Sequence, residues 1–319
     1  MNDSLIVQLL ATGVLYGTPL LIAGLGELVS ERGGILNLGL EGTMLMGAVA
    51  GFYASQQIGG SSFVAVVCAL LVAMIAGGVM SSILAFAAIT LRASQIVAGL
   101  ALTILAGAGG LSSFIGQTEN LSAAEPRHAI EAVNLFGLSD LPVVGPLLFH
   151  QNPMVYISWL LVPAVGIYLW RTRPGLHLRA VGEEPRAADA MGISVVRYRY
   201  LHTIFGGTMA GLAGATYSLA ITPSWTDGMT AGAGWIAIAL VIFALWRPSL
   251  VLIGAYLFGV VTSLGFALQA RGVDLPPELY SSLPYVMTII SLVLVSTAWA
   301  AGRIGAPKGL GTPYSREEL

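Results

Sequence analysis

Long apolar runs, separated by short polar or glycine-rich segments, occupy most of this chain. A helix needs about 20 consecutive apolar residues to cross a bilayer, and roughly nine runs approach or exceed that length. The pattern therefore predicts an all-α polytopic membrane protein with about nine transmembrane helices. The expected spans are residues 5–28, 35–56, 62–91, 95–116, 152–170, 198–221, 232–246, 249–269 and 279–300.

The composition agrees with a membrane protein and narrows its chemistry. Of the 319 residues, 56% are hydrophobic and only 9% are charged, and the mean hydropathy is +0.82. Soluble domains carry about 25% charged residues. The single cysteine, Cys68, excludes a disulfide or a thiolate metal site within the chain. The charges are segregated by loop, so the net charge of −2 gives no indication of a nucleic-acid partner, and we expect none.

The distribution of arginine predicts the orientation. Six of the fourteen basic residues lie between Trp170 and Tyr200, in a loop that separates two predicted spans. Short loops rich in Arg and Lys stay in the cytoplasm, so residues 171–199 are predicted to be cytoplasmic. Counting spans from this loop places the N-terminus outside and the C-terminus inside.

The same count places two further segments. The acidic loop 117–151 falls on the outer side, where we expect Ala123–Val133 to form a surface helix. The spans and their loops form one permease-like domain, residues 1–301. The remaining tail, residues 302–319, is rich in glycine and proline and is expected to be cytoplasmic and irregular.

A short helix is predicted inside the arginine-rich loop. Pro174-Gly175 is expected to end the preceding span. Glu183-Glu184 precede Pro185, which suits the first helical position because it has no N–H to lose, and carboxylates favour the positive end of a helix. Residues 186–191 can form about two turns, and Gly192 suits the position after a helix. The segment is either a solvated anchor for topology or a docking element for a cytoplasmic partner, and the caps favour docking.

The order of the spans predicts an internal repeat. Residues 5–116 and 198–300 each hold four spans, and because one span separates them they have opposite orientations. Each set has a glycine-rich interruption at its second member, at residues 33–42 and 228–234. Interrupted helices at matching places in two inverted halves indicate a transport path. The alternative is that glycine only allows helices to approach closely.

Polar residues next to these interruptions are the candidate pathway residues. Glu41 is a carboxylate followed directly by a long apolar run, and an acid within a membrane is a functional candidate by default. Asn37 is four residues earlier and would share a face with it on a helix. Glu41 could instead tie helices together by accepting backbone N–H bonds. The full candidate set is Asn37, Gly39, Glu41, Thr230 and Trp235.

Other polar residues near the predicted span ends are expected to have simpler roles. Glu27, Glu31 and Arg32 are predicted to lie at the membrane interface, and Gln95 is expected to cap its helix or reach toward the interface. No catalytic residue or metal site is predicted, because the sequence has no phosphate-binding loop, no HExxH and no GxSxG. We also expect no cofactor.

Three segments carry a resemblance to a known family. They are residues 31–42 with 44–48, residues 179–188 with 192–193, and residues 228–232 with 235–239. Together they resemble the permease subunits of bacterial ATP-binding-cassette (ABC) importers of the branched-chain amino acid and ribose group. The likeness covers nearly the whole chain and is greatest to the shorter of the two permeases in nucleoside (simple-sugar) importers.

The resemblance implies a transport subunit of the bacterial plasma (inner) membrane, which forms the path for a nucleoside or related simple sugar and is not itself an enzyme. The implied partners are a second, longer permease in a heterodimer, two cytoplasmic ATPase subunits, an extracytoplasmic binding protein or lipoprotein, and membrane lipids. The pattern Glu184-x-x-Ala187-Ala188-x-x-x-Gly192 resembles the coupling helix that contacts the ATPase. The residues expected in that contact are Glu184, Arg186, Ala187, Ala188 and Gly192.

Two other classes stay open at this point. An ion-coupled secondary transporter would use Glu41 as its protonation site, although such carriers usually bury several ionisable groups. A membrane-embedded scaffold or enzyme would need a catalytic cluster that the sequence does not show.

Overall fold

The computed structural model of the chain is almost entirely helical, and it describes residues 3–59, 61–135, 137–139, 141–272, 276–300 and 305–315. Its α-helices are α1 (Asp3–Arg32), α2 (Leu40–Gln57), α3 (Ser62–Ala85), α4 (Gln95–Ala106), α5 (Leu111–Thr118), α6 (Pro153–Arg171), α7 (Arg173–Glu183), α8 (Pro185–Ala190), α9 (Val195–Thr216), α10 (Ala233–Phe243), α11 (Pro248–Ala270) and α12 (Pro277–Ala300). Shorter helical turns are η1 (Phe86–Thr90), η2 (Leu121–Ala123), η3 (Gly145–Phe149) and η4 (Tyr217–Ile221). Two short strands, β1 (Val133–Asn134) and β2 (His150–Gln151), pair antiparallel.

Helices occupy all of the predicted span positions. Within the described residues, six are long and apolar enough to cross a membrane, and α10 and part of α12 are shorter apolar helices. The prediction of a polytopic helical membrane protein is therefore confirmed in its class, while the count of nine spans stays a prediction. The six are Leu5–Arg32, Ser62–Thr90, Gln95–Thr118, Pro153–Arg171, Val195–Ile221 and Pro248–Ala270.

The two glycine-rich interruptions are present as irregular segments. Residues 33–39, here called the first break, separate α1 from α2, and residues 228–232, the second break, lead into α10. Each break therefore precedes its helix and does not divide it, so α2 begins five residues later than predicted. The predicted span 95–116 corresponds to the candidate span Gln95–Thr118, which is divided into two helices because α4 ends at Ala106 and α5 begins at Leu111. Gly109, with a φ of +76° in the turn between them, has the left-handed backbone that glycine adopts at no steric cost.

The prediction of a surface helix at Ala123–Val133 was wrong. Only η2 overlaps it, and the backbone that follows is irregular, with a bend at residues 127–128, until it enters β1. The reason is that its polar groups are paired with other segments. The N–H of Ile130 donates to the carbonyl of Leu219 (2.8 Å), and the side chain of Asn152 donates to the carbonyl of Ile130 (2.5 Å). In the tail, residues 305–315 are irregular as expected, and the other tail residues lie outside the described part of the chain.

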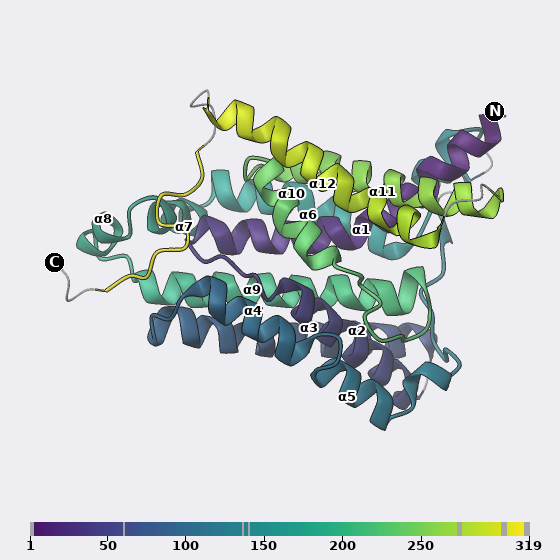
Figure 1. Cartoon of the computed structure of the whole chain (residues 1–319), viewed down its shortest axis with the longest axis horizontal. Coiled ribbons are helices and arrows are strands. Elements are labelled where there is room, and N and C mark those ends of the chain that lie inside the picture. Colours follow the sequence, from purple (N-terminus) through teal and green to yellow (C-terminus); the bar gives the residue numbers. More distant parts are fainter. Residues whose placement is uncertain are drawn as a thin grey trace.

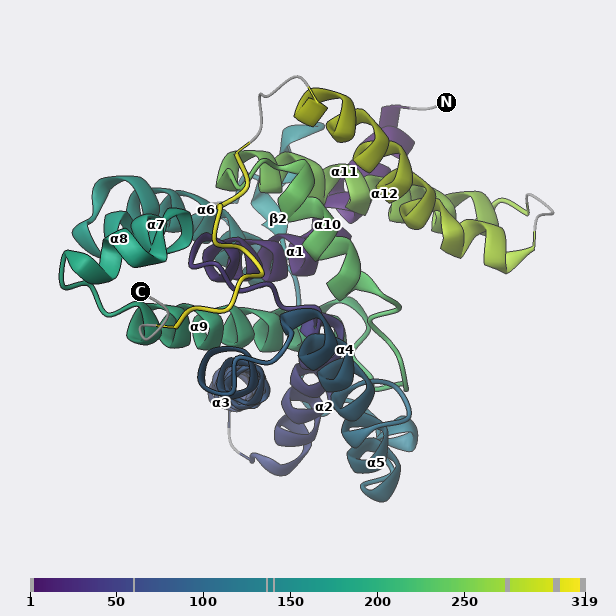
Figure 2. The same ribbon diagram turned by 60° about the vertical axis from the view of Figure 1, so that its left-hand side comes forward.

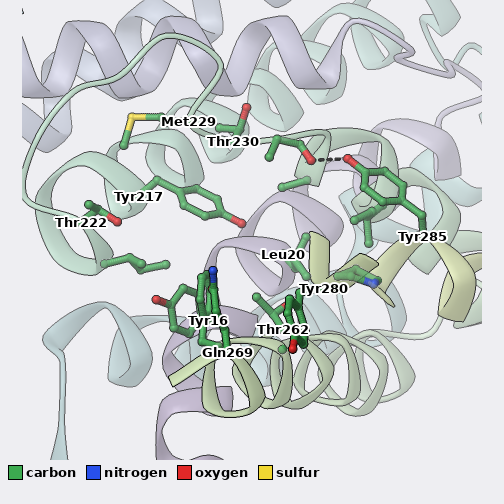
Figure 3. A pocket seen from close by; sticks show the side chains of 17 residues that line it. Tyr16, Leu20, Tyr217, Thr222, Met229, Thr230, Thr262, Gln269, Tyr280 and Tyr285 are labelled. Carbon is green, nitrogen blue, oxygen red and sulfur yellow. Dashed lines mark hydrogen bonds between the residues drawn. The ribbon is translucent and has the colours of Figure 1, made fainter. Parts of the chain in front are cut away.

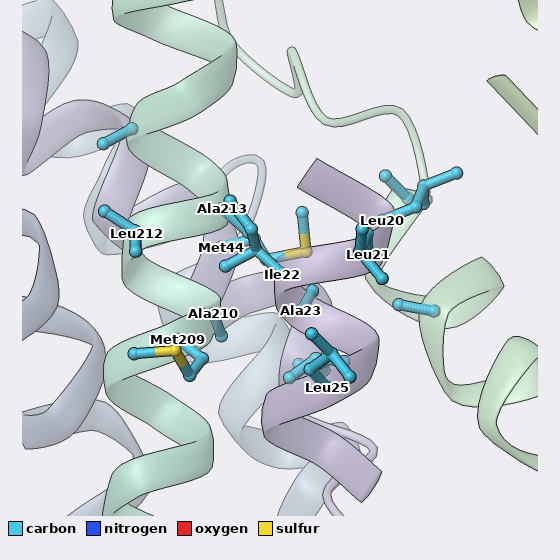
Figure 4. Close-up of a cluster of buried hydrophobic side chains, with 14 of the residues drawn as sticks. Leu20, Leu21, Ile22, Ala23, Leu25, Met44, Met209, Ala210, Leu212 and Ala213 are labelled. Carbon is cyan, nitrogen blue, oxygen red and sulfur yellow. The ribbon is translucent and has the colours of Figure 1, made fainter. Parts of the chain in front are cut away.

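The core lies along the contact between α1 and α9 at the centre of the molecule (Figure 4). Small residues on α9 allow the helix backbones to approach closely, as in other membrane bundles. Around this centre, α3 packs on α9 and α11 packs on α1, while α2 contacts both α3 and α9. The residues seen facing each other in Figure 4 include Leu21, Ile22 and Leu25 of α1, Met209, Ala210 and Ala213 of α9, and Met44 of α2.

The elongated molecule has two distinct ends (Figure 1). One end, called the α8 end, holds α7, α8 and the C-terminal tail. The start of α1 lies at the opposite end. The cluster of arginines predicted to be cytoplasmic is therefore gathered at one end of the bundle.

Candidate functional site

Side chains from neighbouring helices form hydrogen bonds with backbone N–H and C=O groups of the first break. The N–H of Leu36 donates to Oε1 of Gln95 (2.8 Å), and the N–H of Asn37 donates to Oε1 of Glu27 (2.8 Å). The hydroxyl of Thr103 donates to the carbonyl of Leu38 (2.9 Å). Irregular backbone at membrane depth is tolerated only where protein groups replace the missing helical hydrogen bonds. The first break is thus a built, buried element of the bundle.

Asn37 and Gly39 belong to this break and not to a helix. Asn37 is buried, and its side-chain oxygen accepts a hydrogen bond from the N–H of Gly39 (2.9 Å). Because α2 begins only at Leu40, Asn37 lies outside the helix, and the two residues Asn37 and Glu41 do not share a helix face. The side chain of Asn37 shapes the turn into α2.

Glu41 joins the two breaks. Its carboxylate accepts hydrogen bonds from the hydroxyl of Thr230 (2.6 Å) and from the backbone N–H groups of Gly232 (2.8 Å) and Gly234 (2.7 Å). These N–H groups lie at the start of α10, where a negative charge is favourable. The Glu41 side chain is only 6% exposed, and the first turn of α2 is thereby fastened to the first turn of α10. This geometry matches the interpretation that Glu41 ties helices together, and a role in transport stays a prediction.

The structure buries several polar residues that were expected at the membrane interface. Glu27 and Glu31 are fully buried, and Oε2 of Glu31 accepts a hydrogen bond from the indole of Trp246 (2.5 Å). Arg32 donates to the Trp246 carbonyl (3.1 Å). The helix α1 continues to Arg32, four residues beyond the predicted end of the first span, and packs these side chains against other helices. Their location at the membrane interface stays a prediction. Gln95 is likewise buried in the first break. The one sequence signal was the i, i+4 spacing of two acids at the end of an apolar run.

A cavity of about 340 Å³ opens beside the second break (Figure 3). It is bounded by α1, η4, the second break, α10, α11 and the start of α12. Aromatic rings, hydroxyl groups and one side-chain amide line it, and none of its described lining side chains is charged. The hydroxyl of Tyr285 donates to the carbonyl of Ala231, so α12 closes on the second break there. The polar lining residues are Tyr16, Tyr217, Thr222, Thr230, Thr262, Gln269, Tyr280 and Tyr285.

The cavity contains only part of the predicted pathway set. Thr230 lines it, and Glu41 lies directly behind Thr230 through their hydrogen bond. Asn37 and Gly39 lie in the first break and do not line the cavity. Trp235 is 47% exposed on the surface of α10, so the structure does not bring it to the cavity. The tyrosines and Gln269 were missed because they come from four separate elements, and their sequence neighbours gave no signal.

The predicted short helix at the α8 end is present. It runs from Pro185 to Ala190, and Gly192 follows with a φ of +80°. Glu184 is its N-cap residue, although its side chain makes no capping hydrogen bond. Pro174 was expected to break the preceding helix, and α6 does end just before it, at Arg171. It lies in the first turn of α7, which begins two residues after α6, so most of the predicted loop is helical.

Only part of the predicted docking set is on the surface. Glu184, Arg186, Ala187 and Gly192 are exposed. Ala188 is 4% exposed and packs with Val181 and Val195, in a small apolar cluster that holds α8 against α7 and α9. The exposed residues of α8 are Arg186, Ala187 and Ala190, and Ala188 positions the helix.

A bundle of membrane helices with a buried first break, a second break joined to it through Glu41 and an uncharged cavity beside the second break is typical of a multi-pass transport protein. Residues 9–292 match the family described as the permease component of branched-chain amino acid transport systems, and the chain belongs to that family.

The relatives are similar over nearly their full length. TsgC13 of Haloferax volcanii, provisionally named a glucose ABC transporter permease, is 38% identical over 97% of this chain and 98% of its own. The guanosine ABC transporter permease NupQ of Bacillus subtilis is 36% identical over 97% of this chain and 98% of its own. The nucleoside ABC transporter permease NupC of Lactococcus lactis is 35% identical over 97% of each chain.

The resemblance expected from the sequence motifs is confirmed by these comparisons. The chain is an ABC transporter permease of the plasma membrane, and it is a transport component and not an enzyme. A permease of this kind works with ATPase and substrate-binding partners.

Proposed function

We propose that this chain forms the translocation path for a nucleoside or related simple sugar, and that ATPase subunits bound at α8 drive it. The cavity beside the second break carries the proposal. Its volume of about 340 Å³ is within the range of small-molecule sites. Its tyrosine rings offer flat apolar surface to a base or sugar face, and its hydroxyl and amide groups can bond ribose or hexose hydroxyls. The relatives named above are a guanosine permease, a nucleoside permease and a provisionally named glucose permease, and these names agree with this substrate class.

Uptake measurements test the substrate. Cells lacking the gene, with and without the intact chain, are offered radiolabelled guanosine, adenosine, uridine, ribose and glucose. We expect uptake of at least one of these to return only with the intact chain. Gln269→Leu removes the side-chain amide of the cavity and should raise the half-saturation concentration roughly tenfold, because a lost hydrogen bond of about 1.4 kcal/mol corresponds to that factor. Gln57→Leu, an exposed site at the far end of α2, is the control. Uptake that is independent of the chain for all five compounds would contradict the proposal.

Reciprocal packing supports the inverted repeat. A Cβ on Gly77 of α3 would lie 2.2 Å from the carbonyl oxygen of Gly207 on α9. A Cβ on Gly259 of α11 would lie 2.0 Å from the carbonyl oxygen of Gly13 on α1. In each case the third helix of one repeat packs, through glycine, on the first helix of the other. This equivalence is what two inverted four-helix repeats require.

Cysteine labelling tests the orientation. With Cys68 replaced by alanine, Glu125→Cys and Arg186→Cys each place a single exposed thiol at opposite ends of the protein. An impermeant maleimide added to intact cells should label position 125 and should leave position 186 unlabelled until the membrane is opened. Labelling of position 186 in intact cells would show that the α8 end is outside.

The proposed assembly contains a second permease in a heterodimer, two cytoplasmic ATPase subunits docked on α8, and an extracytoplasmic binding protein or lipoprotein. The exposed face of α8 supports the docking part, because Met191 directly after it is 81% exposed and Ala187 presents a small residue beside it.

The secondary-transporter alternative is less well supported. Both carboxylate oxygens of Glu41 accept hydrogen bonds from groups of this chain. Protonation of Glu41 in each transport cycle would have to break the junction between α2 and α10.

A further inference from the structure

The C-terminal tail is built into the α8 end of the bundle. The described tail residues run back across α7 and α9 and pass beside the end of α1 (Figures 1 and 2). The N–H of Gly309 donates to the carbonyl of Gly182 in α7 (2.8 Å). The N–H of Gly311 donates to the carbonyl of Gly34 in the first break (3.3 Å). The tail thus contacts both α7 and the first break through its backbone.

A buried arginine holds the tail against the first break. Arg199 of α9 is only 2% exposed. Its Nε donates to the carbonyl of Gly33 (3.2 Å), its Nη1 to the carbonyl of Thr312 (3.1 Å) and its Nη2 to the carbonyl of Gly309 (3.4 Å). A guanidinium group presents its donors in a fixed planar arrangement, so one side chain can hydrogen-bond to two separate backbone segments, here the first break and the tail.

Burying the charged side chain of Arg199 has a cost in free energy. Burying a cation is unfavourable unless its donors are satisfied, and the three acceptors of Arg199 named above are backbone carbonyls. Carbonyls that leave their helix or strand need donors as well. Arg199 therefore satisfies the first break and the tail together, and neither can move far without leaving the guanidinium group unpaired.

The far end of the tail reaches the docking helix. Tyr314 packs on the apolar cluster that contains Ala188 of α8 together with Val181 and Val195. The tail therefore contacts α8 at one end and the first break at the other, over a stretch of a few residues.

We propose that residues 307–315 link α8 to the first break, and that Arg199 is the positioning residue of this link. The inference rests on the proposed function, in which α8 receives the movement of an ATPase. A displacement of α8 then pulls on Tyr314 and reaches the carbonyl groups of Gly33 and Gly34 through the tail. The first break, which shapes the entry to α2, moves in response.

A thiol in the first break reports this movement. Leu38→Cys is introduced with Cys68→Ala, and the full chain is purified with its partner subunits. The rate of reaction of this thiol with a maleimide is measured without nucleotide and with ATP plus vanadate. Nucleotide should change the rate when Arg199 is present, and Arg199→Met should remove the change while the ATPase stays bound. Arg199→Lys keeps the charge without the planar fork and should give a partial response.

Two further variants complete the test. Arg197→Met changes an exposed arginine on the same helix and should behave as the unmodified chain. Tyr314→Ala removes the packing of the tail on the cluster of Val181, Ala188 and Val195 while Arg199 keeps its three carbonyl acceptors, and it should also remove the nucleotide response.

The outcomes separate the link from the proposed function. Failure of the ATPase to co-purify with the chain that retains Arg199 would overturn the proposed docking on α8. With the ATPase bound, an unchanged nucleotide response in both Arg199→Met and Tyr314→Ala would overturn the link. So would the absence of any response when Arg199 is present. Loss of the ATPase from Arg199→Met alone would show that Arg199 supports docking and would also overturn the link.

Discussion

Replacing Glu41 by leucine is expected to abolish substrate uptake. The change leaves the hydroxyl of Thr230 and the N–H groups of Gly232 and Gly234 without their acceptor. Each buried donor that loses its partner costs about 1–3 kcal/mol, so the junction of α2 with α10 loses its main polar attachment. The second break borders the cavity, and its shape should change with the junction. Radiolabelled uptake in cells that carry the complete importer measures the effect.

Two comparisons make this result specific. Glu41→Gln keeps one side-chain oxygen but places an NH₂ group against a backbone donor, so we expect a partial loss of uptake. Glu119→Leu removes an exposed acid and should transport normally. The subunits should still co-purify in Glu41→Leu, because the packing of α3 on α9 and of α11 on α1 is remote from the change. Uptake at the normal rate in Glu41→Leu would remove Glu41 from the transport path.

Replacing Ala187 by glutamate should prevent the ATPase subunits from co-purifying. Ala187 is exposed on α8, so a partner that docks there would bury the new carboxylate without a counter-charge. Burying an unpaired charge at an interface costs several kcal/mol, which is enough to break a transient contact. Membrane insertion and pairing with the second permease should be unaffected.

The choice of Ala187 over Ala188 follows from burial. Glutamate at the buried Ala188 would disturb the cluster with Val181 and Val195 and displace α8 itself, which would confuse docking with folding. Ala132→Glu, at an exposed site in the segment predicted to be outside, is the control. If Ala187→Glu retains the ATPase and supports normal uptake, then α8 only anchors the topology.

The sequence predicts the helices and both breaks because these depend on local features. An apolar run of sufficient length must pair its backbone internally in a membrane, so helices are the available structure for segments such as 62–91. Clusters of glycine at 33–42 and 228–234 interrupt the helical hydrogen bonds, and they do so whatever the position of the helix in the bundle. The short helix that ends before Gly192 is predicted for the same reason, since proline, carboxylates and glycine favour the start or the end of a helix within a few residues of their own position.

Burial of individual side chains depends on partners far away in the chain and was not predicted. Glu27 was assigned to an interface because its acceptor role for the N–H of Asn37 depends on how the first break folds back. Arg199 was counted only as a topological charge, since its acceptors in the first break and the tail are more than 100 residues away. The cavity was missed for the same reason, because it is assembled from α1, η4, α11 and α12.

The packing of α11 on α1, and of α3 on α9, joins the two repeats and also sets an order of events in biosynthesis. The first helix, α1, receives its glycine contact from Gly259 of α11, and ribosomes synthesise α11 only after most of the chain. Contacts between segments so distant in sequence form slowly, because the intervening chain must first be ordered. Until α11 is inserted, the surface of α1 around Gly13 and Gly17 must face lipid or another protein. The first half of this permease therefore enters the membrane before its packing is complete. The contact of α1 with α11 forms only after the second half has been inserted.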